Sequence, residues 1–170
     1  MTYKRSKMTF AAAAESHLDD VYGYLVYLTG DRSLAEDLAS STFERALRMW
    51  RRFDPKRASA RTWLCQIARS VALDHFRSEQ RRRRREDQYA ADLPAAAEDE
   101  RLVDGLSPEL ETALRSLSAA DREVIALRVL LELDTPTAAR VLGISPTACT
   151  TRLNRALQRL EERMRDAVHA

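Results

Sequence analysis

The 170-residue sequence has few residues that break helices or form cross-links: four glycines, five prolines and two cysteines, and only 6% of its residues are aromatic. Ala, Leu, Arg and Glu are abundant and favour helix by intrinsic propensity. We therefore predict an all-α fold. Cys65 and Cys149 lie far apart, in different predicted modules, which argues against a disulfide framework and favours a reducing compartment.

Other absences exclude whole classes of protein. No apolar run reaches the roughly 20 residues of a membrane-spanning helix, and no long apolar stretch follows Lys4, Arg5 and Lys7 as it would in a signal peptide. Direct membrane insertion is not expected, and we predict a cytoplasmic protein. The sequence has no Gly-rich phosphate loop, and its histidines and cysteines lack metal-ligand spacing. We predict no enzyme activity, no cofactor and no metal.

The formal net charge of +2 conceals two opposed blocks of charge. Six arginines lie between Arg77 and Arg85, against a single acid, whereas nine acids lie between Glu86 and Glu111, against Arg101 alone. Residues 86–107 show no apolar stripe, so we predict that they form a flexible acidic linker between two small helical domains. A further hypothesis is that this linker folds onto the arginines of the free protein and masks them from DNA.

Apolar spacing predicts three helices before the linker. Residues 15–28 repeat apolar side chains every three or four positions, the pattern of a helix with one buried face, and Gly30 ends this helix. Ser33 with Glu36 has the spacing of a capping box for the second helix. The third helix begins near Arg61. The residues predicted to be buried are Leu18, Val21, Tyr22, Leu25 and Leu28 in the first helix and Leu64, Ile67, Ala68 and Val71 in the third.

A helix-turn-helix pattern marks the chain after the linker. Pro108 fits the first position of an opening helix, and Ser118 fits the N-cap of the next. A short helix then ends at Gly143, and Ser145 opens the long helix 147–164. The second helix of such a unit enters the major groove with its amino-terminal residues on base edges. The predicted buried stripe of the long helix is Cys149, Leu153, Leu157, Leu160 and Met164, and the predicted DNA face is Thr147, Thr150, Thr151 and Asn154, flanked by Arg152, Arg155 and Arg159.

Plainer interpretations of these features stay open. The helix-turn-helix can also be an ordinary pair of helices with a charged solvent face. The arginines at 81–85 can be a solvated helix end, a flexible arm or a nonspecific phosphate contact. The aromatic residues also have two interpretations. Stacking on unpaired bases is open to Trp63, Phe53 and Phe76, and the plainer alternative is core packing. For Trp63, core packing is the favoured interpretation.

From about Glu15 to Met164 the chain resembles the extracytoplasmic-function (ECF) group of bacterial RNA polymerase sigma factors. Several separate matches in the family's order make this a specific signal, whereas a helix-turn-helix alone is a weak one. The matching residues are Ala35-Glu36-Asp37-Leu38, Thr42-Phe43 and Ala46; then Phe53-Asp54-Pro55, Trp63-Leu64, Ile67-Ala68-Arg69, Asp74 and Arg77; then Leu142-Gly143-Ile144-Ser145, Arg152-Leu153 and Arg155-Ala156-Leu157. Four residues depart from those usual in the family: Ser40, Ser70, Thr137 and Thr150.

The resemblance implies a sigma factor that binds core RNA polymerase, through its largest-subunit clamp helices and its flap region, and promoter DNA. An anti-sigma factor is a further candidate partner. The loop 53–60 is implied to hold a flipped base. The implied polymerase-binding residues are Glu36, Asp37, Leu38 and Phe43. The implied minus-10 residues are Phe53, Lys56, Arg57, Arg61, Trp63, Arg69, Ser70, Arg77 and Arg81. The implied minus-35 residues are Ser145, Thr147, Thr150, Thr151, Arg152, Asn154 and Arg155.

The resemblance also divides the chain into four segments. Residues 1–9 are an amino-terminal tail, 10–85 a region 2-like domain, 86–107 the linker, and 108–170 a region 4-like helix-turn-helix domain.

Two other functions stay open. A stand-alone helix-turn-helix regulator predicts duplex binding without polymerase, and a helical protein that binds RNA through its basic run predicts no sequence preference.

Overall fold

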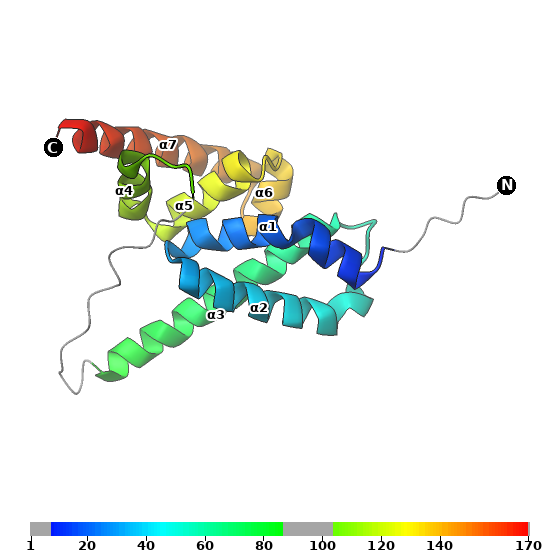
Figure 1. The fold of residues 1–170 in the computed structure, drawn as a ribbon. Helices are drawn as coiled ribbons and strands as arrows, with labels where there is room; N and C mark the ends of the chain where they lie inside the picture. Colours follow the sequence, from blue (N-terminus) through cyan, green and yellow to red (C-terminus); the bar gives the residue numbers. More distant parts are fainter. Residues whose placement is uncertain (1–7, 87–103, 170) are drawn as a thin grey trace.

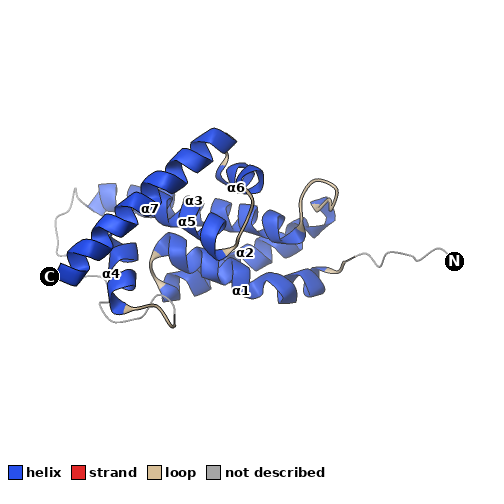
Figure 2. Ribbon diagram, turned by 90° about the horizontal axis from the view of Figure 1, so that it is seen from above, coloured by secondary structure: helices blue, strands red, loops and turns tan. Residues whose placement is uncertain are grey.

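The computed structural model describes residues 8–86 and 104–169, and in these residues it contains helices and no strand (Figure 1 and Figure 2). The predicted all-α fold is confirmed. Before the gap lie α1 (Phe10–Thr29), α2 (Arg32–Met49), the short 3-10 helix η1 (Trp50–Arg52) and α3 (Ala60–Glu86). After it lie α4 (Pro108–Ser116), α5 (Ala119–Ile125), the π-helical segment η2 (Ala126–Leu130), α6 (Thr135–Leu142) and α7 (Pro146–His169). Residues 87–103 lie outside the described residues. They make up most of the predicted linker, so the hypothesis that the linker masks the arginines concerns residues outside the described ranges.

Helix α1 begins five residues earlier than the sequence pattern predicts, because Thr9 caps it. The Thr9 hydroxyl accepts a hydrogen bond from the Ala12 amide at 3.2 Å, and the alanines that follow are strong helix formers. The helix ends as predicted at Gly30, whose φ of 71° is the left-handed conformation that glycine adopts without strain.

The predicted capping box at Ser33 and Glu36 is wrong. Asp31 is the N-cap of α2, and its carboxylate accepts a hydrogen bond from the Leu34 amide at 2.9 Å. The left-handed Gly30 places Asp31 in an extended conformation directly before the helix, two residues earlier than the capping box requires. After the gap, the predicted cap at Ser118 is confirmed, since its hydroxyl accepts from the Asp121 amide at 3.1 Å.

Replacing Asp31 with alanine is therefore expected to lower the free energy of unfolding by about 1 kcal/mol, because the Leu34 amide loses its acceptor. Ser33→Ala is the matched control, with an expected change below about 0.5 kcal/mol. Urea denaturation followed by circular dichroism measures both variants. Equal losses in the two variants would contradict the assignment of the cap to Asp31.

The predicted buried stripes are largely correct, with errors at their edges. Leu64, Ile67, Ala68 and Val71 of α3 are all buried. Leu18 of α1 and Leu157 of α7 were predicted to be buried, but they are 51% and 40% exposed. Each lies at the margin of its helix's apolar stripe, where the neighbouring helices do not cover it.

The helices before and after the gap pack against each other. Helices α1, α2 and α3 form one unit, α4 to α7 form another, and α5, η2 and α6 lie against α1 and α3 (Figure 1). Buried residues of both units belong to one continuous hydrophobic cluster. This packing brings the amino-terminal half of α3 close to the helix-turn-helix, while the arginine-rich end of α3 extends away from the bundle (Figure 1).

Candidate nucleic-acid interface

Helices α6 and α7 form the helix-turn-helix. Asp134 caps α6 by accepting a hydrogen bond from the Thr137 amide at 2.7 Å, and this bond lowers the pKa of the Asp134 carboxyl. Gly143, with φ 66°, makes the turn, and the Ser145 hydroxyl accepts from the Ala148 amide at 3.2 Å at the start of α7. Each of these two bonds satisfies one of the free amides at the start of its helix, and together with the turn at Gly143 they fix where α7 begins.

The amino-terminal part of α7 presents a basic and hydroxylated hollow. Five of the seven predicted minus-35 residues line it: Ser145, Thr147, Thr151, Arg152 and Arg155. The other two, Thr150 and Asn154, are exposed on α7 but do not line the hollow. Arg159 also lines the hollow, and one of its guanidinium nitrogens donates to both carboxylate oxygens of the buried Asp121, at 2.9 and 2.8 Å. Asp121 thus holds the Arg159 side chain in place.

Helix α3 carries a second exposed basic surface. Arg77 and Arg81 are exposed on the half of the helix that extends from the bundle, as are the remaining arginines up to Arg85. Ser70 is also exposed, and a residue that the sequence analysis did not single out lies against it. Arg45 of α2 donates to the Ser70 hydroxyl at 3.2 Å and to the Asp74 carboxylate at 3.2 Å. Nothing local in the sequence indicates this contact, because 25 residues separate Arg45 from Ser70.

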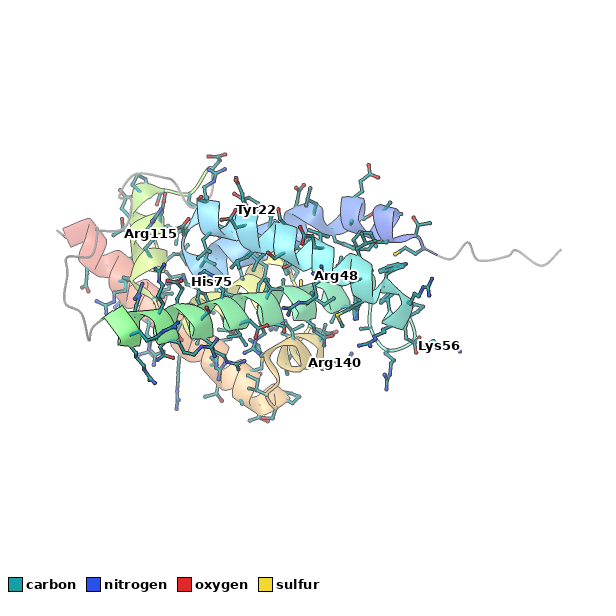
Figure 3. The ribbon with its side chains drawn as sticks, turned by 90° about the horizontal axis from the view of Figure 1, so that it is seen from below. Tyr22, Arg48, Lys56, His75, Arg115 and Arg140 are labelled. Atoms are coloured by element: carbon teal, nitrogen blue, oxygen red, sulfur yellow. The ribbon has the colours of Figure 1, made fainter. Side chains whose placement is uncertain are left out.

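An aromatic cluster holds the base of the loop 53–60. Phe53 stacks on Trp50 with ring centroids 4.8 Å apart, and Trp63 meets the same indole edge-on at 5.7 Å. All three rings are partly buried, so the favoured interpretation of Trp63 as a packing residue is supported. Beyond the cluster the loop is polar, and Lys56 and Arg57 are exposed. In Figure 3, Lys56 lies at the outer end of this loop.

Three of the predicted minus-10 arginines are engaged in ion pairs. Arg77 lies 3.7 Å from the Asp74 carboxylate on the same helix and stays largely exposed. Arg61 lies 3.9 Å from the Asp20 carboxylate of α1. Arg69 donates its Nε–H to Glu123 of α5 at 2.8 Å, and the Arg69 side chain is only 24% exposed. Helix α5 therefore covers Arg69, whereas Ser70 stays exposed.

The predicted polymerase-binding residues lie on α2 but differ in exposure. Glu36 and Asp37 are exposed, and Phe43 is partly buried against the core. Leu38 is 5% exposed, so in this structure its side chain packs inward. The surface available to a partner on this part of α2 is therefore acidic.

The two cysteines are free thiols inside the bundle. Burial raises the pKa of the Cys65 thiol to about 12, with a further contribution from the nearby charge of Asp20. Burial also raises the pKa of Cys149.

In residues 8–86 and 104–169, no group of three or more His, Cys, Asp or Glu residues is arranged to hold a metal ion. Within the same described ranges no helix is both long and apolar enough to span a membrane.

Cys65 and Cys149 of the native protein are expected to react slowly with iodoacetamide at pH 8. The thiolate is the nucleophile, and the raised pKa values keep both buried thiols protonated. Mass spectrometry after a timed exposure measures the reaction at each cysteine. In urea both residues should be alkylated rapidly, which is the control. Rapid modification of Cys65 in the native state would show that α3 opens on that timescale.

A helix-turn-helix with a basic hollow, packed beside a second helix that carries an exposed row of arginines, defines a DNA-binding protein with two separate basic surfaces. Residues 13–82 match the family model for Sigma-70 region 2, and residues 107–160 match that for Sigma-70, region 4. The chain belongs to the ECF group of RNA polymerase sigma factors. It is an alternative sigma factor, which directs promoter-specific transcription initiation.

Curated relatives and a solved structure show this similarity along most of the chain. The chain is 33% identical over 160 residues to the ECF sigma factor BldN of Streptomyces coelicolor, covering 92% of this chain but 61% of the relative. It is 30% identical over 163 residues to SigX of Bacillus subtilis, covering 92% and 84%. The sigma factor RpoE of Bartonella quintana, solved with the anti-sigma factor NepR, has a TM-score of 0.74 and 26% identity, covering 92% of this chain and 96% of RpoE.

Proposed function

We propose that this sigma factor uses three separate surfaces, one for core RNA polymerase and one for each promoter element. Residues 10–85 act as the region 2-like domain and residues 108–170 as the region 4-like domain. Residues 86–107 link the two, and residues 1–9 precede them. No surface has a catalytic role, since each acts by binding alone.

The observation that carries the minus-35 assignment is the hollow on α7. Ser145, Thr147, Thr151, Arg152 and Arg155 converge there from the first three turns of a helix whose start is fixed by a cap. Hydroxyl and guanidinium groups at this position of a recognition helix can bind phosphates and base edges. Thr150 and Asn154 extend the same surface outside the hollow.

The minus-10 surface comprises the loop 53–60 and the exposed side of α3. Lys56, Arg57, Arg77 and Arg81 are exposed cations that can bind the phosphate backbone. The cluster of Trp50, Phe53 and Trp63 holds the loop so that an extruded base can be bound beside it. Ser70 faces solvent next to Arg45, and this pair is suited to hydrogen bonds with a base or sugar.

The remaining proposals concern partners and location. Glu36, Asp37 and Phe43 of α2, supported from inside by Leu38, contact the clamp helices of the largest polymerase subunit, and the region 4-like domain contacts the flap. An anti-sigma factor binds the free protein, as NepR binds RpoE of Bartonella quintana. The protein acts in the cytoplasm and lies on the nucleoid when it is bound to polymerase.

Transcription reconstituted with purified core polymerase and a pool of genomic DNA fragments tests the promoter-reading function. Sequencing the 5′ ends of the transcripts should give discrete, protein-dependent start sites that share two spaced upstream elements. Sequence-specific duplex binding without polymerase, together with an absence of protein-dependent starts, would favour a stand-alone regulator instead.

A further inference from the structure

An arginine of α2 reaches across to α3. Nη1 of Arg45 donates to the Ser70 hydroxyl at 3.2 Å and to a carboxylate oxygen of Asp74 at 3.2 Å, and Nη2 donates to the same oxygen at 3.3 Å. Ser70 and Asp74 are four residues apart on α3, so their side chains lie on one face of that helix. Three hydrogen bonds to these two neighbours fix the orientation of the Arg45 guanidinium.

This cluster of Arg45, Ser70 and Asp74 lies on the surface. The Arg45 side chain is 38% exposed and that of Asp74 is 53% exposed, and the second carboxylate oxygen of Asp74 lies 3.7 Å from Arg77. Exposed ion pairs contribute little to stability, because water screens the charges and two long side chains lose conformational freedom. The cluster therefore does little to hold α2 against α3, and a role in binding explains its defined geometry better.

One edge of the Arg45 guanidinium is left for a partner. A guanidinium carries five N–H groups, and the contacts with Ser70 and Asp74 use both of those on Nη1 and one on Nη2. The second Nη2–H and the Nε–H lie side by side in the plane of the group. Within residues 8–86 and 104–169, no acceptor is bonded to Nε. This edge matches two acceptors in one plane, as in a phosphate group or in the O6 and N7 atoms of guanine.

Asp74 favours guanine over a phosphate as this partner. A phosphate that binds Arg45 comes close to the Asp74 carboxylate and is repelled by it, whereas the edge of a guanine carries no net charge. Phosphate contacts also require little beyond positive charge, while a bidentate base contact requires a guanidinium whose plane is fixed. The bonds to Ser70 and Asp74 provide that fixed plane.

We propose that Arg45 is a specificity-determining residue of this sigma factor and binds a guanine of the minus-10 element through its O6 and N7 atoms. Asp74 and Ser70 act as positioning residues, because they hold the guanidinium. The inference rests on the proposed role of α3 in binding the minus-10 element. It adds a residue of α2, the helix that otherwise contacts polymerase, to the surface that selects the promoter sequence.

A promoter selection with the full-length protein and core polymerase tests the base preference. From a pool randomised across the minus-10 element, the wild type should favour guanine about tenfold over other bases at one position. Arg45→Lys keeps the charge but cannot form the bidentate contact, so this preference should disappear while the preferences at other positions remain. Arg48→Lys is the matched control and should keep every preference, because Arg48 is another exposed arginine of α2 (Figure 3).

Asp74→Ala separates a positioning role from a structural one. This substitution removes a negative charge from the proposed DNA surface, so holoenzyme that carries it should bind a promoter fragment without the guanine at least as tightly as the wild type. The guanine preference should at the same time fall below about threefold, because a mobile Arg45 side chain loses more freedom on binding. A variant that is merely less stable would bind all fragments less tightly by the same factor.

A modified base tests which atoms Arg45 binds. 7-Deazaguanine lacks the N7 acceptor but still pairs with cytosine. In place of the preferred guanine it should lower transcription by the wild type about fivefold, the lower end of the range for a bidentate contact, and leave transcription by Arg45→Lys unchanged. Equal losses in the two proteins, or no guanine preference in the wild type, would overturn the proposal. A guanine preference that survives in Arg45→Lys would overturn it as well.

Failure of the Arg45 proposal can be distinguished from failure of the proposed promoter-reading function. A wild-type protein that gives no protein-dependent start sites from the pool would contradict promoter reading, and the role of Arg45, which rests on it, would fall too. A wild type that directs transcription from discrete start sites, with the same minus-10 sequences selected by Arg45→Lys, would contradict the role of Arg45 alone.

Discussion

Replacing all five arginines at 81–85 with glutamine is expected to weaken the salt dependence of promoter binding by the polymerase that carries this sigma factor, because five phosphate contacts are lost. These side chains are exposed on the end of α3 that extends from the bundle (Figure 1). Each phosphate contact contributes about 0.9 to the slope of log affinity against log salt, so five contacts contribute about 4.5. Between 50 and 200 mM salt the wild type should therefore lose about 10²- to 10³-fold more affinity than the variant.

Lysine at the same five positions is the control, because it keeps the charge while removing the planar guanidinium. The lysine variant should retain most of the salt slope if the contacts are to phosphates. A wild-type slope in the glutamine variant would mean that this part of α3 is only a solvated helix end. The measurement is a filter-binding titration of a promoter fragment at several salt concentrations, with holoenzyme at each point.

The sequence predicts well the features that depend on residues close together in the chain. The buried stripe of α3, the cap at Ser118 and the turn at Gly143 were all predicted correctly. Each depends on residues within one or two helical turns, where periodicity and capping chemistry act directly. The errors at Leu18 and Leu157 arise because periodicity shows which face is apolar but not how far the neighbouring helices cover it.

Contacts between distant residues could not be predicted in this way. Arg69 was predicted to bind DNA from its place on α3, but its partner Glu123 lies 54 residues away on a helix of the other half. Arg45 reaches Ser70 across 25 residues, and no local pattern marks either pair. The same limit applies to Trp50, which completes the aromatic cluster at the base of the loop 53–60. Such contacts depend on how the helices pack, which charge and periodicity leave undetermined.

Coupling between the two halves also affects how a substitution should be interpreted. Arg69 of α3 donates to Glu123 of α5, so a loss of function in Arg69→Ala combines a lost DNA contact with a weakened interface between the two helical units. Arg152 and Arg155 line the hollow of α7, and none of the residues that line this hollow belongs to α1, α2 or α3. Substitutions there report on DNA binding more directly.

Replacing both Arg152 and Arg155 with alanine is expected to reduce transcription from a promoter with an intact minus-35 element by about 100-fold. Each guanidinium in a bidentate contact contributes about 1–3 kcal/mol, and two contributions of about 1.4 kcal/mol each correspond to this factor. Initial rates of transcript formation at limiting holoenzyme measure the effect. Arg163→Ala is the matched control, because Arg163 is an exposed arginine of α7 that lies outside the hollow.

The minus-35 element itself decides whether the loss is specific. On a promoter whose minus-35 sequence has been scrambled, the double variant and the wild type should transcribe at the same low rate, because the contacts that the variant lacks are then absent for both. A variant that is merely less stable would lose activity on both promoters by the same factor. A 100-fold loss that persists on the scrambled promoter would show that Arg152 and Arg155 stabilise the domain instead of binding the upstream element.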